Sequence, residues 1–87
     1  MIHLRVFTHP TCRTCPQAIR LASEIAEGQP DIDFRVISLG SAQGRAIARE
    51  MQVLSVPTVF VDDIRFVGVP TRDALLEAIQ QRRQAQK

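Results

Sequence analysis

The spacing of apolar residues along this chain switches repeatedly between two periods, and this switching restricts the possible fold more than any other feature. Residues 2–7 place an apolar side chain at every second position, which is the period of a β-strand. From Arg13 the apolar residues recur at helical spacing, and Pro16 falls in the first turn, where its missing N–H costs nothing. Gly28 ends this pattern. The opening residues therefore predict a strand, a loop and an amphipathic helix that begins near position 12.

The rest of the chain continues in the same manner. The next predicted elements are a strand at 32–39 and a helix at 42–51 that is capped by Ser41. Two strands follow at 58–61 and 65–68, joined by a turn at Asp62 and Asp63. The last helix is capped by Thr71 and has Asp73 in its first turn. The order is β-α-β-α-β-β-α, in which the first β-α-β unit is parallel and the last two strands form a hairpin. We expect an α/β fold, with a mixed four-stranded sheet in the order second, first, third, fourth and helices on both faces.

Length and composition narrow the class of protein. A chain of 87 residues forms one domain, which we expect to span 1–87. A formal net charge of +2 with dispersed arginines predicts neither nucleic-acid nor membrane binding. The cluster of Arg82, Arg83 and Lys87 is interpreted as a solvated helix end. The start, MIHLRVF, lacks the basic region and long apolar run of a signal peptide, so we expect a cytoplasmic protein. We also expect it to be a monomer.

The residues most capable of chemistry are Cys12 and Cys15, which lie between the first strand and the first helix. A thiol at a helix start lies near unpaired N–H groups and the positive end of the helix dipole, which lower its pKa and favour the reactive thiolate. Arg13 adds positive charge between the two cysteines. A spacing of three residues along a helical turn also allows a disulfide. We predict that Cys12 is the exposed attacking thiol and that the shielded Cys15 resolves the mixed disulfide.

Three other interpretations of the cysteines are open at this point. They could be inert or form a structural staple, which is rare in the cytosol. They could bind zinc together with His3 and His9, since two Cys and two His satisfy a tetrahedral site. They could also serve a redox-sensing or binding module that oxidises once and does not turn over. No cofactor and no metal are needed by the dithiol mechanism.

A second marker is Ser55-Val56-Pro57-Thr58, just before the predicted third strand. Proline cannot donate to a strand ladder, so Pro57 belongs at a strand start. Most X–Pro bonds are trans, and the residues alone predict only a proline that punctuates this strand.

Taken together, these motifs resemble the thioredoxin-fold superfamily over roughly residues 2–82, and most of all the small glutaredoxin-like thioredoxins. The matching segments are Cys12-Arg13-Thr14-Cys15-Pro16, Ser55-Val56-Pro57-Thr58, Val59-Phe60-Val61 and Val67-Gly68. The resemblance implies a cis Val56–Pro57 bond beside the cysteines and strand addition of an extended substrate peptide at Val56. It implies protein disulfide substrates and a thioredoxin-reductase-like reductant. Arg13, Thr14, Val56 and Pro57 are accordingly expected to bind substrate.

The chain departs from this pattern in three places. Thioredoxins proper carry an aromatic residue before the first cysteine and a buried acid in the first strand, where this chain has Thr11 and Val6. His9 is a candidate replacement for the acid, and an ordinary loop residue otherwise. Glutaredoxins seat glutathione with a Gly-Gly pair, where this chain has Gly68-Val69, so glutathione binding is left open.

Overall fold

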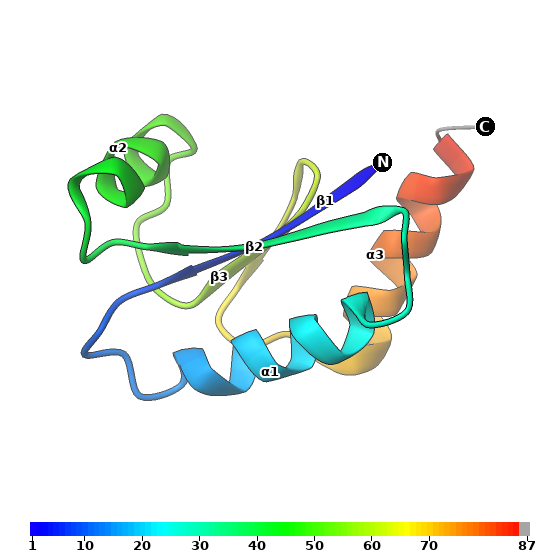
Figure 1. Cartoon of the computed structure of the whole chain (residues 1–87), viewed down its shortest axis with the longest axis horizontal. Coiled ribbons are helices and arrows are strands. Elements are labelled where there is room, and N and C mark those ends of the chain that lie inside the picture. The colour runs from blue at the N-terminus through cyan, green and yellow to red at the C-terminus, as the bar shows by residue number, and fades with distance from the viewer. Residues whose placement is uncertain (86–87) are drawn as a thin grey trace.

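A computed structural model describes residues 1–85, and it has the predicted order of elements (Figure 1). The elements are β1 (Ile2–Thr8), α1 (Cys15–Ala26), β2 (Ile32–Ser38), α2 (Ala42–Glu50), β3 (Thr58–Val61), β4 (Ile64–Val67) and α3 (Arg72–Ala85). The predicted bounds are wrong by up to three residues. The largest difference is the start of α1, which lies at Cys15 and not near position 12.

The four strands form one mixed sheet in the order β2-β1-β3-β4, as predicted. β1 and β2 are parallel, whereas β1 with β3 and β3 with β4 are antiparallel. The register pairs Phe7 with both Ile37 and Thr58. The carboxyl ends of β1 and β2 and the start of β3 therefore lie at one edge of the sheet, which we call the active-site edge.

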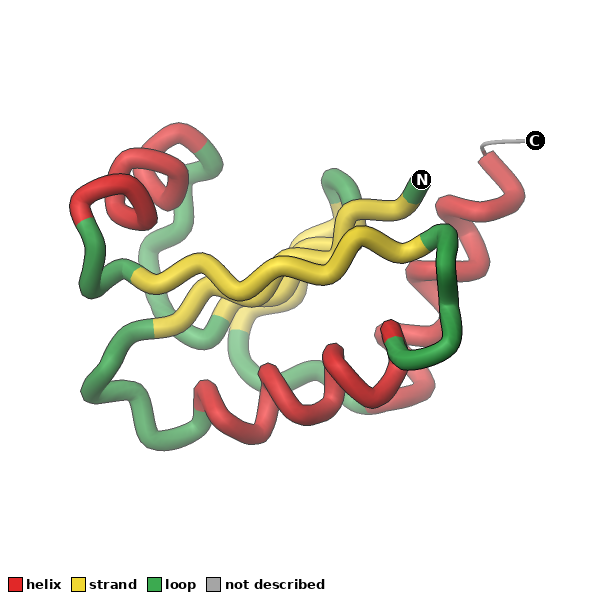
Figure 2. Tube along the Cα trace, viewed as in Figure 1, coloured by secondary structure: helices red, strands yellow, loops and turns green. Residues whose placement is uncertain are grey.

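Helices cover both faces of the sheet, as Figure 2 shows for the two layers on either side of the strands. α1 and α3 pack on one face, over a cluster that includes Leu4, Val6 and Leu75. α2 packs on the other face, where Phe7 and Phe60 meet edge to face with ring centroids 5.7 Å apart. The apolar β1 side chains that face α1 and α3 are fully buried, whereas on the α2 face Phe7 is buried and His3 and Arg5 are partly exposed.

Local chemistry explains where the helices begin. The Ser41 hydroxyl accepts a hydrogen bond from the Gly44 amide at 3.0 Å, and the Thr71 hydroxyl accepts one from the Ala74 amide at 3.1 Å. Both residues are therefore N-caps, as predicted. Gly44 is required by close packing, because a Cβ there would collide with the carbonyl oxygen of Ser38.

The basic end of α3 differs from its predicted role as a solvated helix end. Arg82 forms an ion pair with Asp62 at 2.9 Å, and Arg83 forms one with Asp31 at 2.7 Å. These pairs attach α3 to the loops at the edge of the sheet opposite the active-site edge. Lys87, the third member of the predicted cluster, lies outside the described residues. Within residues 1–85, no helix combines the length and apolar character that crossing a membrane requires.

Candidate active site

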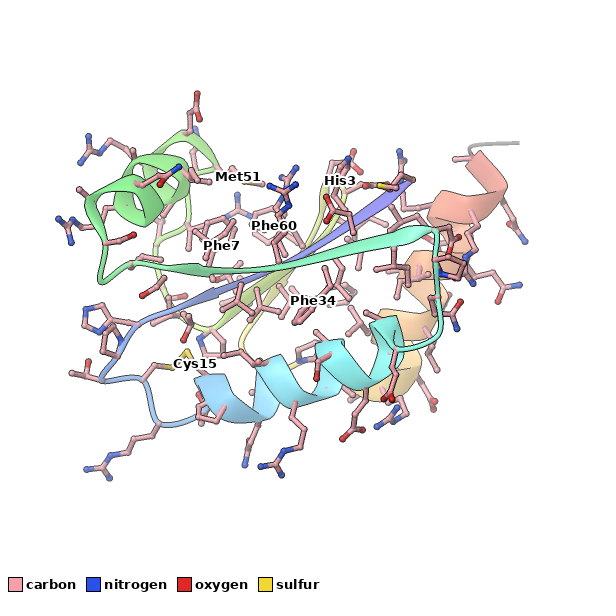
Figure 3. The ribbon with its side chains drawn as sticks, in the orientation of Figure 1. His3, Phe7, Cys15, Phe34, Met51 and Phe60 are labelled. Atoms are coloured by element: carbon pink, nitrogen blue, oxygen red, sulfur yellow. A yellow bond between two sulfur atoms is a disulfide. The ribbon has the colours of Figure 1, made fainter. Side chains whose placement is uncertain are left out.

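Cys12 and Cys15 form a disulfide, with their Cα atoms 5.5 Å apart. This separation is ordinary for a disulfide, so the backbone holds the two sulfurs within bonding reach. Cys15 is 1% exposed and lies in the first turn of α1, below the sheet in Figure 3. Cys12 lies in the preceding loop and is partly exposed. The two sulfurs are thus chemically distinct, since only one of them can be approached by a large disulfide substrate.

The loop before α1 has several backbone donors close to Cys12 along the chain. Thr14 is the N-cap residue, but its side chain makes no capping hydrogen bond. The backbone N–H groups of Arg13, Thr14 and Cys15 have no acceptor within residues 1–85. Cys12 therefore precedes the helix and does not belong to its first turn, but it lies beside unsatisfied donors at the helix start. This corrects the predicted position of the thiol, which lies in the loop before the helix.

Thr14 has a contact that sequence reasoning missed. Its Oγ1 lies 3.9 Å from Sγ of Cys12, within the longer range of hydrogen bonds to sulfur. A hydroxyl in this position can donate to a thiolate once the disulfide is reduced. The Arg13 side chain is exposed between the two cysteines.

The His9 side chain makes its hydrogen bonds within the loop that precedes Cys12. Its Nδ1 accepts a hydrogen bond from the Thr11 amide at 3.2 Å and lies 2.9 Å from the Thr11 hydroxyl. The Cys12 amide donates to the His9 carbonyl oxygen at 3.0 Å. These contacts are typical of an ordinary loop residue, which was the second interpretation given for His9.

The four residues of the predicted zinc site are not brought together. His3 lies at the start of β1, well away from Cys15 (Figure 3). Its Nδ1 is 3.3 Å from an Asp33 carboxylate oxygen. Across residues 1–85, His, Cys, Asp and Glu side chains form no group of three or more placed to hold a metal ion. The structure therefore does not gather His3 with the cysteines, as a zinc site built from these residues would require.

The Val56–Pro57 peptide bond is cis, as the resemblance implied. Pro57 is buried, and its carbonyl oxygen accepts a hydrogen bond from the Gly68 amide at 2.8 Å. The buried Thr58 hydroxyl donates to the Ser55 carbonyl oxygen at 2.7 Å. Because Thr58 pairs with Phe7, this loop lies at the active-site edge with the cysteine loop. Neither backbone polar group of Val56 has a partner within residues 1–85, which leaves both able to pair with a peptide.

The carboxylates lie mostly at the opposite edge of the sheet. Hydrogen bonds from Arg83 lower the pKa of Asp31, and those from Arg35 lower the pKa of Asp33. Burial acts to raise the pKa of Asp62, but the His3 amide and the Arg82 guanidinium together hold it below the ordinary value. In the described residues, Thr58 is the only polar residue that is fully buried, so no buried acid lies under Cys15.

A thioredoxin fold with a partly exposed and a buried cysteine at the start of α1, beside a cis-proline loop, defines a thiol–disulfide oxidoreductase. Residues 2–80 match the Thioredoxin domain family. The chain is 35% identical to a thioredoxin of Methanocaldococcus jannaschii, over 93% of this chain and 95% of that protein. It is 37% identical to a probable thioredoxin of Methanothermobacter thermautotrophicus, over 91% and 93% of the two chains.

Solved thioredoxin structures have the same fold as this chain. A mutant thioredoxin of Halobacterium salinarum has a TM-score of 0.76 and 28% identity, covering 92% of this chain and 73% of its own. Spinach chloroplast thioredoxin F shares the fold, with a TM-score of 0.74 and 22% identity, covering 94% and 76% of the two chains. The chain belongs to the thioredoxin family and is a protein-disulfide reductase. Membership implies protein disulfide substrates and a reductase partner.

Proposed function

We propose that Cys12 is the attacking thiol of this reductase and that Cys15 is the resolving thiol. The observation that carries the assignment is the difference in exposure, since Cys15 is 1% exposed and Cys12 is partly open to solvent. An incoming protein disulfide reaches only the outer sulfur, and the helix start stabilises the thiolate there.

The reaction proceeds by two exchanges. The Cys12 thiolate attacks one sulfur of the substrate disulfide, so that a mixed disulfide forms as the substrate S–S bond breaks and its other sulfur leaves as a thiolate. Cys15 then loses its proton and attacks Cys12 Sγ, which releases the second substrate sulfur and closes the Cys12–Cys15 bond. The leaving thiolates take up protons. The reductase partner supplies two electrons and two protons to restore the dithiol.

Substrate binding is assigned to Arg13, Thr14, Val56 and Pro57. The unpaired N–H and C=O of Val56 support strand addition of an extended peptide, and the buried Pro57 holds this loop at the active-site edge. Exposed Arg13 and Thr14 line the approach to Cys12 from the other side.

Single-cysteine variants test the assignment. Cys12→Ser should abolish turnover of a protein disulfide such as insulin, whereas Cys15→Ser should accumulate a covalent mixed disulfide that mass spectrometry detects. Far-UV circular dichroism of both variants serves as the folding control. Turnover by Cys12→Ser, or a mixed disulfide formed on Cys15 in that variant, would reverse the two roles.

We further propose that residues 1–87 act as one monomeric domain in the cytoplasm, where reductants maintain thiols and a cycling dithiol can be renewed. Glutathione is proposed to be a poor ligand, because the Val69 side chain takes the place of a second glycine after Gly68. Saturable reduction of the disulfide by glutathione at low concentration would contradict this, and sedimentation would test the monomer.

A further inference from the structure

A groove runs beside α2, next to the active-site edge, and the proposed mechanism does not use it. It has a volume of about 450 Å³. Its walls are formed by four apolar residues, two arginines and one glutamine, namely Leu39, Ala48, Val53, Leu54, Arg45, Arg49 and Gln52. Leu54 is 94% exposed, so its side chain is open to a ligand that enters the groove.

The groove is continuous with the active site through its two bordering loops. The Leu39 amide donates to the Thr8 carbonyl oxygen at 2.8 Å, at the point where β1 leads into the cysteine loop. At the neighbouring Gly40, an added Cβ would lie 3.0 Å from the Pro10 ring, so this loop touches the segment before Cys12. On the other side, Leu54 is two residues from Val56, or about 7 Å along an extended chain. A peptide paired with Val56 could therefore reach the groove within two or three residues.

The charged side chains that line the groove are all positive. Arg45 donates to the carbonyl oxygens of Leu39 and Gly40 at 3.2 and 3.3 Å, and Arg49 lies in the last turn of α2. Neither arginine has a carboxylate within ion-pair distance in residues 1–85. Glu50, the acid adjacent in sequence, lines a separate cavity with Arg5 and Arg35. All other carboxylates belong to segments outside 38–57.

We propose that this groove binds the segment of a protein substrate that flanks the target disulfide, and that it selects an apolar side chain with an acidic residue beside it. The apolar side chain packs against Leu54 and Val53, and the acidic residue pairs with Arg49 at the rim. This inference rests on the proposed function and names the substrates that the site prefers. Charge complementarity would act mainly by accelerating encounter, and its effect would fall as salt concentration rises.

Peptide substrates test the inference. We would prepare a short cyclic disulfide peptide without an arm, and the same peptide with Leu-Glu-Glu, Leu-Lys-Lys or Ser-Glu-Glu attached at either end of the ring. Reduction by the dithiol protein is followed at low and high salt. We expect the Leu-Glu-Glu arm, in at least one orientation, to be reduced about tenfold faster than Leu-Lys-Lys at low salt, with a smaller difference at high salt.

Variants then locate the effect. Arg49→Glu should reverse the preference between acidic and basic arms, and Leu54→Ser should remove the advantage of Leu-Glu-Glu over Ser-Glu-Glu. Arg20→Glu is the matched control, because Arg20 is exposed on α1, has no ion-pair partner in the described residues, and undergoes the same charge change. It should leave the ratio between arms unaltered.

The outcomes separate the two proposals. Failure to reduce even the arm-free peptide would contradict the proposed function itself. Reduction of all peptides at equal rates would overturn the groove inference and leave the mechanism intact. A dimer in sedimentation that Arg49→Glu dissociates would assign the groove to a second copy of this chain, and would also overturn it.

Discussion

The hydroxyl oxygen of Thr14 lies 3.9 Å from the sulfur of Cys12, on the loop that leads into α1. Thr14 makes no side-chain capping bond to the helix, so no helix amide competes with the sulfur for its hydroxyl. Together with the unpaired N–H groups of the loop, it forms the polar surroundings of the one sulfur that a substrate can reach. Four predictions follow from this site and from the scaffold that positions it.

Replacing the hydroxyl of Thr14 tests its role. Thr14→Val keeps the shape of the side chain and removes the donor, so the pKa of Cys12 should rise. A weak hydrogen bond is worth about 0.5–1 kcal/mol, so the alkylation rate of the reduced protein at neutral pH should fall about two- to fivefold. The measurement is the pH profile of iodoacetamide labelling at Cys12. Thr14→Ser retains the hydroxyl and should match the wild type; equal profiles for all three proteins would remove Thr14 from the mechanism.

The positive charge of Arg13, like the Thr14 hydroxyl, should favour the thiolate form of Cys12. Arg13→Glu replaces attraction by repulsion, so it should raise the pKa of Cys12 and slow alkylation at neutral pH and low salt by about three- to tenfold. Iodoacetamide is neutral, so its own attraction to the site does not contribute. Arg13→Gln should give an intermediate rate, and added salt should reduce the differences. A faster reaction in the Glu variant would contradict the electrostatic account.

The Asp62–Arg82 pair predicts how stability depends on pH. The folded state holds the pKa of Asp62 below the unfolded value of about 3.9, so this contribution is present above about pH 4 and is lost as pH falls through the folded-state pKa. Asp62→Asn should cost about 1 kcal/mol of unfolding free energy at pH 7 and less at pH 3. Urea denaturation at both pH values measures it.

A neighbouring carboxylate provides the control for this pair. Asp63 is 3.7 Å from the same arginine, but its side chain is 84% exposed, whereas that of Asp62 is 13% exposed. Asp63→Asn should therefore change stability little at either pH. Equal losses from the two substitutions would show that the His3 amide and the partial burial of Asp62 do not matter.

The glycine in α2 tests the packing that shapes the active-site edge. Gly44→Ala would normally favour a helix by about 1 kcal/mol, but here the added Cβ collides with the Ser38 carbonyl oxygen. We expect a net loss of about 1–3 kcal/mol, measured by thermal or urea denaturation. Gln43→Ala, at the exposed position before it, should be close to neutral. A stabilised Gly44→Ala protein would show that the end of β2 can move away from α2 at little cost.

Much of the fold could be predicted from local signals. The alternation in residues 2–7, the helical stripe from Ala18 to Ile25, and the caps at Ser41 and Thr71 all depend on neighbours within a few positions, and the structure confirms them. The predicted start of α1 was wrong, because the spacing of the residues in the cysteine loop is also compatible with a helix. In the structure, hydrogen bonds between His9 and Thr11 hold this loop in a non-helical conformation, and the helix begins at Cys15.

The sequence by itself determined that two thiols lie three residues apart between a strand and a helix, a spacing that allows them to form a disulfide. The tertiary structure decided which sulfur is open, since Cys15 is buried by the packing of α1 against a sheet built from distant strands. It also brought Leu39, Arg49 and Leu54 around one groove. Such groupings arise from long-range contacts, and no local pattern of spacing or charge encodes where separate loops will meet.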